Sequence, residues 1–511
     1  MKLNLIANLK RNVLAAAVNT FIKLLFPFLN RTLFLWLMGP AYLGLNGLFG
    51  SILGVLMLAE LGFGTAVICS MYKPVADEDN DLLCAYLKFY RTVYRCVGGT
   101  IFIIGLILLP FLRDLVHGSI PPDIDLHLLY LIHLLNTSLS YFLFAYRGSI
   151  LSAYHRQDVV TNIRTTASVA QYIASFIALL VTRNYYCYVV VTVCFTAFQN
   201  LMILYESKKR FPQVVPRGNL PAALKAKVIH DVKSIFMHKV GGVITYSVGN
   251  VIISAFLGLI AVAKYGNYYY LYTAVSGIVW TVYYSMTSGF GNRIHTESRE
   301  DNFALFIRFN RLTGIVIVWC SAMMTALYQP FLLEWSRGKT GLMCHALTPI
   351  LMVVFFYVSQ SRQVLLTFKS AAALWHQDRW KPIVAGIVNL SATILLVIYL
   401  PEEYKLDGVI FSAIISLLLV QIPWESLVVF KEFFNREQAG IYWRFQADFA
   451  LLALVLCFLT GGGTYLIPVK GITGLLIKGI AATIISGGFL MAFCRRDLLA
   501  AFHAIRKKDA K

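Results

Sequence analysis

Long apolar segments alternate with short polar connections along almost the whole chain. A helix needs about 20 predominantly apolar residues to cross the hydrocarbon core of a bilayer. About fourteen segments meet this requirement, so we predict an all-α integral membrane protein with about fourteen transmembrane helices. They lie near residues 13–38, 43–71, 93–112, 126–148, 164–182, 187–205, 236–260, 267–290, 311–328, 342–367, 382–400, 408–430, 447–467 and 472–494.

The composition supports this interpretation. Hydrophobic residues make up 58% of the chain and charged residues only 14%, whereas soluble proteins contain about 25% charged residues. The net charge of +20 is also typical of nucleic-acid-binding proteins, but the apolar segments favour basic loops that face membrane lipids. We therefore expect membrane lipids, and no nucleic acid, among the partners.

The sequence offers no familiar catalytic or cofactor motif. The nine cysteines are scattered without a CxxC pair, so neither a disulfide framework nor a metal site is expected. No P-loop, HExxH or GxSxG motif occurs. We predict a protein that binds no cofactor and is not an enzyme.

Basic residues indicate the orientation in the membrane. If the N-terminus is cytoplasmic, most Lys and Arg fall on the cytoplasmic side, above all in residues 206–235 and the C-terminal tail. Both termini are then cytoplasmic, which requires an even number of spans. The outer side carries few basic residues, namely Arg113, Arg183, Lys264, Arg337, Lys339, Lys405, Lys470 and Lys478.

The chain resembles itself at an offset of about 220 residues. Chance similarity between Gly- and Tyr-rich apolar segments is the alternative, but three ordered correspondences favour a true repeat. The matching pairs are Tyr42–Gly54 with Lys264–Gly277, Tyr154–Asp158 with Trp375–Arg379, and Asn19 and Asn30 with Lys239 and Asn250.

The repeat predicts two six-helix lobes in the same orientation, a known transporter architecture with substrate near the midplane. Two C-terminal helices have no counterpart and are predicted to be additional. The expected regions are an N-terminal lobe (1–205), a basic cytoplasmic linker (206–235), a C-terminal lobe (236–435) and two additional helices with a basic tail (436–511).

Several short motifs resemble bacterial polysaccharide flippases of the multidrug/oligosaccharidyl-lipid/polysaccharide exporter superfamily. The resemblance extends from the first span through at least the twelfth. The motifs are Tyr42–Phe49, Leu58–Gly64, Met71–Ala76, Lys239–Gly242, Asn250–Ser254, Phe368–Asp378 and Asn389–Ser391. Two segments, Lys405–Gly408 and Ala371–Ala373, contain fewer glycines than the family pattern, which leaves the substrate open.

The resemblance implies two lobes in a V around a central cavity. It also implies translocation of undecaprenyl-diphosphate-linked oligosaccharides from the cytoplasmic to the outer leaflet of a bacterial inner membrane. A lipid-linked oligosaccharide would be the substrate, and a polysaccharide polymerase and export machinery would be partners.

Charged and amide side chains inside the spans are candidates for substrate binding, because a central Lys or Arg costs about 2.5–3.5 kcal/mol to insert. Arg and Lys would hold a diphosphate through charge-assisted hydrogen bonds. Alternatively, Arg31 and Lys239 extend to opposite interfaces, and Arg147 and Arg362 do the same at their span ends. The candidates are Lys23, Arg31, Arg147, Lys239, Arg362, Asn19, Asn30 and Asn250.

Other polar residues have two interpretations each. Glu60 and Glu425 either pair with buried cations or bind a coupling ion. His127 and His133 either carry protons or pack in the bundle. The tyrosines of the segment 268–284 either stack on sugar rings or form an interfacial aromatic belt.

Two other functions compete with a flippase. A multidrug or cation exporter on the same fold would favour an acidic, aromatic cavity, whereas the interior charges here are mainly basic. A membrane polysaccharide polymerase would need a large outer loop, and the sequence predicts only short ones.

Overall fold

The computed structural model describes residues 22, 25–60, 62–230, 232, 247–294, 297–337, 340–372, 374 and 377–495. All regular secondary structure in these residues is helical. Nine helices in this part of the chain are long and apolar enough to cross a membrane, or ten if a bent pair counts as one span. The all-α membrane fold is therefore confirmed, and the count of fourteen spans stays a prediction.

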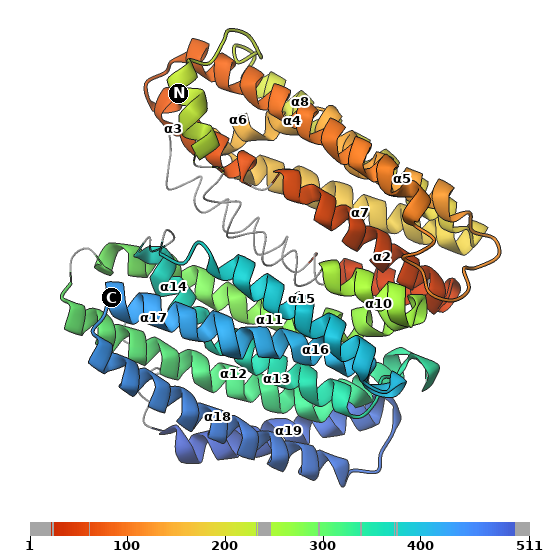
Figure 1. Ribbon diagram of the computed structural model, residues 1–511, viewed down its shortest axis with the longest axis vertical. Coiled ribbons are helices and arrows are strands. Elements are labelled where there is room, and N and C mark those ends of the chain that lie inside the picture. Colours follow the sequence, from red (N-terminus) through yellow and green to blue (C-terminus); the bar gives the residue numbers. More distant parts are fainter. Residues whose placement is uncertain are drawn as a thin grey trace. The chain divides into compact units, whose positions relative to one another are not determined.

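The chain divides into two compact units, Met1–Ala263 (unit 1) and Lys264–Lys511 (unit 2). The predicted lobe boundaries near residues 205 and 236, and the V around a central cavity, stay predictions. The helices of unit 1 are α2 (Pro40–Leu56), α3 (Phe63–Ala76), α4 (Asn80–Leu108), α5 (Leu126–Phe142), α6 (Gly148–Ala153), α7 (Gln157–Thr182), α8 (Tyr185–Arg210) and α10 (Gly249–Leu257) (Figure 1).

Helix α11 (Leu259–Ile294) begins in unit 1 and continues into unit 2. The other helices of unit 2 are α12 (Arg299–Trp335), α13 (Leu347–Ser361), α14 (Gln363–Ala371), α15 (Lys381–Tyr399), α16 (Lys405–Ser416), α17 (Ile422–Glu432), α18 (Arg436–Tyr465) and α19 (Gly471–Phe493).

Close backbone contacts hold α10 against the rest of unit 1. A Cβ atom on Gly44 of α2 would lie 2.0 Å from the carbonyl oxygen of Leu259, so only glycine fits there. At the end of α10, the Ser254 hydroxyl donates to the carbonyl of Leu115 at 2.7 Å. Gly258 follows in the left-handed region with φ 84°.

Several predicted spans are broken helices. In unit 1, α5 ends at Phe142, Phe144 has a left-handed φ of 57°, and a 3-10 turn (Ala145–Arg147) leads into α6. The two helical parts meet at a bend of 42°. In unit 2, α13 ends at Ser361 and α14 begins at Gln363, so Arg362 lies at the break.

A π-helical segment, Leu417–Gln421, separates α16 from α17. Together with a 3-10 turn before α16 (Glu402–Tyr404), these three elements form one apolar span, Glu402–Glu432. A π turn contains an extra residue and is found frequently at functional sites. Here it lies one turn before Glu425, in the region where the charged residues of unit 2 gather.

The additional C-terminal helices α18 and α19 pack along α12 (Figure 1). Their shared core contains Val318 and Ala322 of α12, Leu456 of α18 and Leu490 of α19. Burial of these apolar side chains against one another, together with close packing, holds the three helices together.

Candidate functional site

Three of the predicted site residues, Asn19, Lys23 and Lys239, lie outside the described residues, and their roles stay predictions. The other candidates fall in unit 1 (Asn30, Arg31, Glu60, Arg147 and Asn250) and unit 2 (Arg362 and Glu425).

Asn30, Arg31 and Asn250 each contact a different partner in unit 1. The Asn30 side chain donates to the Tyr188 hydroxyl at 2.7 Å. The Asn250 amide donates to the Ser51 hydroxyl at 2.9 Å. The Arg31 guanidinium lies 3.5 Å from the carbonyl oxygen of Ala263. These contacts tie the segment around residue 30 and helix α10 to the rest of unit 1, which is a structural role at minimum.

Glu60 lies at the end of a 3-10 turn (Met57–Glu60) and is held by two tyrosines. Its Oε1 accepts from the Tyr94 hydroxyl at 2.7 Å, and its Oε2 accepts from the Tyr141 hydroxyl at 2.6 Å. Within the described residues no Lys or Arg forms an ion pair with it. Phenol donors therefore satisfy this carboxylate in unit 1.

Arg147 is buried, with 3% of its surface exposed. Its Nη1 donates to the carbonyl oxygen of Val214, in the segment after α8, at 2.9 Å. Its Nε is buried and finds no hydrogen-bond acceptor among the described residues. A buried guanidinium bonded to one neutral carbonyl retains donors for a further acceptor.

Arg362 lies in a buried network of charged side chains in unit 2. Its Nη1 donates to Oε1 of Gln421 at 2.6 Å and lies 3.3 Å from Oε1 of Glu425. The Nε of Arg362 and Oε2 of Glu425 are buried, and neither has a hydrogen-bond partner in the described parts of the chain. Glu425 is fully buried.

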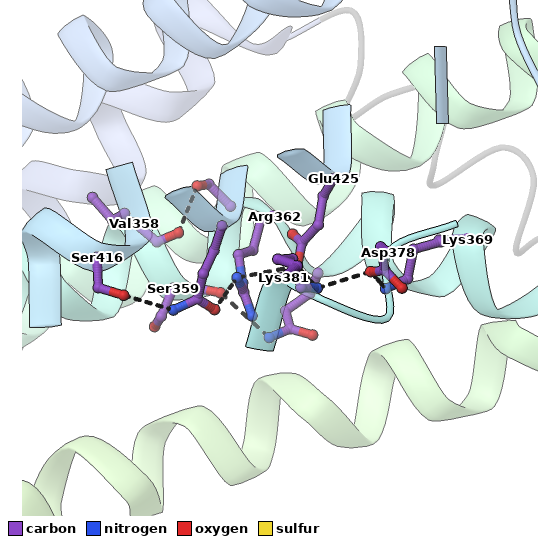
Figure 2. A network of polar contacts seen from close by, with 11 residues as sticks. Val358, Ser359, Arg362, Lys369, Asp378, Lys381, Ser416 and Glu425 are labelled. Atoms are coloured by element: carbon purple, nitrogen blue, oxygen red, sulfur yellow. Dashed lines mark hydrogen bonds and ion pairs between the residues drawn. The ribbon is translucent and has the colours of Figure 1, made fainter. Parts of the chain in front are cut away.

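The network continues through two lysines that sequence analysis did not select. Lys381, the first residue of α15, binds Glu425 at 2.5 Å and Asp378 at 3.0 Å. Lys369 of α14 also binds Asp378. Figure 2 shows this chain of contacts from Lys369 through Asp378 and Lys381 to Glu425 and Arg362.

The local sequence explains how these groups meet. The break after α13 places Arg362 beside the π segment that carries Gln421. The connection between α14 and α15 brings Asp378 back against Lys369, and Pro382 in the first turn of α15 suits a helix start. The charged residues of the network therefore come together from α14 and its start, the connection after α14, α15 and α17, namely Arg362, Lys369, Asp378, Lys381 and Glu425.

Among the described residues, three cationic side chains, Arg362, Lys369 and Lys381, form ion pairs with two carboxylates, Asp378 and Glu425. Asp378 lies in the connection outside the spans. Burial tends to raise the pKa of its carboxyl group, but Lys381 and Lys369 outweigh this effect and hold the pKa below its usual value. Asp378 is therefore ionised at neutral pH, and the described cluster has more cationic than acidic side chains, which suits it to attracting an anion.

Three of the tyrosines and His133 pack inside their units, whereas His127 is exposed and its Nδ1 lies 3.8 Å from Oδ1 of Asp125. Tyr268, Tyr272 and Tyr283 are buried in unit 2, and Tyr268 donates to the side-chain oxygen of Gln329 at 2.7 Å. The two interpretations of the tyrosine segment, an interfacial belt and stacking on sugar rings, stay predictions. His133 packs against Phe49, with ring centroids 5.4 Å apart.

No three His, Cys, Asp or Glu side chains converge as a metal site in the part of the chain that the structure describes.

The fold is similar to solved membrane transporters. Lipid II flippase MurJ in an inward closed conformation superposes with a TM-score of 0.63 at 14% identity, over 95% of this chain and 100% of that one. An inward-facing multidrug resistance MATE family transporter of the MOP superfamily gives 0.60 at 12% identity, over 80% of this chain and 94% of that one. MATE in a bent conformation gives 0.54 at 13% identity, over 84% and 95%.

A search of curated protein sequences finds no significant match. A family model described as polysaccharide biosynthesis protein matches residues 9–285, which is more than half of the chain. The fold and this match agree with the resemblance found in the sequence, and the multi-pass membrane architecture supports both. The chain therefore belongs to the polysaccharide biosynthesis protein family.

Proposed function

We propose that the protein is a flippase for lipid-linked oligosaccharides and not an enzyme. It would move undecaprenyl-diphosphate-linked repeat units from the cytoplasmic to the outer leaflet by alternating access, for cell-surface polysaccharide synthesis. The match of residues 9–285 to the polysaccharide biosynthesis family carries this proposal. The flippase named among the structural neighbours supports a lipid-linked substrate.

The buried cations supply a chemical reason for such a substrate. A diphosphate group is strongly hydrated and cannot cross hydrocarbon without compensating charge and hydrogen bonds. Arg147 and Arg362 each keep a buried Nε that lacks an acceptor among the described residues. In our proposal these groups bind the diphosphate during the transport cycle, together with Lys23, Arg31 and Lys239.

The remaining candidates have supporting roles in this proposal. Asn19, Asn30 and Asn250 line the path of the headgroup, and Glu60 and Glu425 bind a coupling ion or balance the cations. The protein would lie in a bacterial inner membrane with both termini cytoplasmic, as the distribution of basic residues indicates. A polysaccharide polymerase and export machinery would use the flipped product.

Deletion of the gene in its host tests the proposal. A flippase mutant accumulates lipid-linked repeat units on the cytoplasmic leaflet, and the wild-type gene restores export. Single unpolymerised units on the outer leaflet would instead identify a polymerase. Normal polysaccharide with increased drug sensitivity would identify a multidrug or cation exporter, the function of the MATE neighbours.

Lys23 provides a site-level test in the same host. We expect Lys23→Ala to abolish export while the amount of protein in the membrane stays at the wild-type level. The reason is that the diphosphate would lose its contact with a cation deep in the predicted first span. Export and immunoblotting measure the two outcomes. Normal export by this variant would remove Lys23 from the mechanism.

A further inference from the structure

Helices α12, α18 and α19 share an apolar core towards one end, and a cavity lies between them towards the other. At the packed end, Ile315 and Val318 of α12 contact Ala453 of α18 and Leu490 of α19 within one apolar core. Further along, the Thr460 hydroxyl of α18 lies 3.4 Å from the carbonyl oxygen of Ala322. Beyond this contact, towards the connection between α18 and α19, a cavity opens.

The cavity has a volume of about 450 Å³ and lies entirely within unit 2. Its walls include Gln329, Leu333 and Glu334 of α12, Thr464 of α18, and Leu475 and Lys478 of α19. Most of the lining is apolar, while Lys470 and Lys478 contribute two positive charges. The pocket therefore combines an apolar interior with a cationic part.

Neither lysine has a carboxylate within ion-pair distance among the described residues. The one acidic group in the lining, Glu334, accepts a hydrogen bond from the backbone N–H of Gly471 at 2.9 Å. Glu334 is thereby bound to the connection between α18 and α19. The charges of Lys470 and Lys478 are left for another anion.

Lys478 is the eighth residue of α19, a helix that is apolar enough to cross a membrane. At a rise of about 1.5 Å per residue, it lies roughly 10 Å along the axis from the start of the helix. A lysine at such a depth needs an anionic partner or a path to the interface. The cavity beside it provides space for either one.

We propose that this cavity binds an anionic phospholipid from the leaflet next to the α18–α19 connection. Lys470 and Lys478 bind the phosphate, and one acyl chain occupies the apolar part between α12, α18 and α19. Charge complementarity selects the headgroup, and the apolar walls select a lipid over a soluble anion. This site is independent of the proposed transport substrate.

Lipid retention by the purified full-length protein tests the proposal. The protein is placed in nanodiscs of phosphatidylcholine with an equal share of phosphatidylglycerol, and retained lipid is measured by native mass spectrometry after delipidation. We expect wild-type protein to retain phosphatidylglycerol preferentially. In Lys470→Gln/Lys478→Gln we expect the preference for phosphatidylglycerol to fall roughly ten- to thirtyfold. Each lysine near an anionic headgroup contributes about 1 kcal/mol, and every 1.4 kcal/mol corresponds to a tenfold change in affinity.

A charge-matched control is Lys225→Gln/Lys227→Gln, which removes two exposed lysines of unit 1. It retains the wild-type preference if the cavity lysines are responsible. An equal loss in the control, or an unchanged preference in Lys470→Gln/Lys478→Gln, overturns the proposal. Equal retention of phosphatidylcholine and phosphatidylglycerol by wild-type protein overturns it as well.

A second pair of variants tests the acyl chain. Leu475→Trp fills the cavity and is expected to abolish retention with both lysines intact, whereas Leu476→Trp on the exposed neighbouring position leaves it unchanged. Equal retention by the two variants contradicts the proposal. The proposal is also contradicted if inorganic phosphate raises the melting temperature of the wild-type protein as much as phosphatidylglycerol does. That result would indicate a site for simple anions and not for a lipid.

Discussion

Arg147 in unit 1 and Arg362 in unit 2 occupy similar positions at broken spans but have different surroundings. Each follows a long apolar helix and precedes a short one, α6 or α14. Arg147 donates to a neutral carbonyl oxygen, whereas Arg362 pairs with Glu425. The same local element can therefore be built with or without a buried counter-charge.

The acidic residues around the two arginines show the same difference. In unit 1, Arg156 pairs with Asp158, and Arg210 pairs separately with Glu206. Asp378 and Glu425 of unit 2 lie at about the repeat offset of 220 residues from Asp158 and Glu206. In unit 2, these two acids belong to one buried network. The acids at these two positions form separate ion pairs with nearby residues in unit 1, whereas in unit 2 they belong to one network that joins several helices.

The largest expected effect is on the stability of the network. Glu425→Ala leaves Arg362 and Lys381 buried without their shared carboxylate, which costs about 3–5 kcal/mol in comparable buried pairs. Glu206→Ala removes a partly exposed pair between residues four apart and is expected to cost at most about 1 kcal/mol. Apparent melting temperatures of the purified variants measure both. Similar losses would show that the two units do not differ as described.

The second prediction separates substrate binding from stability. Arg362→Gln lowers both the melting temperature and export, because Glu425 loses a partner. Arg362→Gln/Glu425→Gln keeps the net charge of the network and leaves Asp378 as the partner of Lys381, so stability recovers in part. Export stays reduced by about tenfold or more, the equivalent of one lost interaction of about 1.4 kcal/mol.

Arg147→Gln is the matched variant in unit 1. It leaves no buried carboxylate behind, so it should reduce export with little change in melting temperature. Restored export in the Arg362→Gln/Glu425→Gln variant would show that Arg362 has only a structural role.

The third prediction concerns pH. The lowered pKa of Asp378 means that its ionised form stabilises the folded protein. This contribution is complete above the unfolded pKa of about 3.9 and is lost as the pH falls through the lower folded value. The difference in melting temperature between wild type and Asp378→Asn should be constant from neutral pH to about pH 5 and shrink below about pH 4. A difference that already disappears near neutral pH would contradict an ionised Asp378.

The smallest expected effect concerns the backbone at the two breaks. Phe144 has a φ of 57°, so Phe144→Gly should be more stable than Phe144→Ala by about 1 kcal/mol. Arg362 has a φ of −85°, where the order of the Gly and Ala variants should be reversed. Chemical or thermal unfolding measures the two differences. The same order at both positions would mean that the breaks share one backbone conformation.

The sequence predicted the all-helical membrane fold, because long apolar segments are a strong signal; the bounds of single helices were predicted unevenly, and α12 (Arg299–Trp335) extends well beyond the predicted 311–328. The predicted segments 382–400 and 472–494 differ by one residue at each end from α15 (Lys381–Tyr399) and α19 (Gly471–Phe493). The breaks were not predicted. Neither Pro nor Gly marks the left-handed turn at Phe144, so tertiary packing decides it. Pro423 follows the π segment Leu417–Gln421 by two residues and was a usable signal, because a proline removes the N–H group that would bond to the residue four positions earlier.

The site was only partly predictable for a related reason. Arg362 and Glu425 were selected because charges inside apolar segments are unusual. Lys369, Asp378 and Lys381 lie beside a polar connection, where charges are ordinary, and only the folded chain shows that they are buried. The repeated Asp158 and Asp378 motifs were a usable signal, since an acid at the same place in both copies indicates a shared structural role.

The π segment before α17 determines how this span would respond to a change in its length. A helix advances about 100° per residue, and the wide turn at Leu417–Gln421 accommodates one extra residue, so α17 keeps the direction that it would have in a regular helix one residue shorter. A one-codon deletion within this segment would therefore restore a regular α-helix and leave Glu425 facing Arg362 and Lys381. We expect such a deletion to lower the melting temperature much less than Glu425→Ala does.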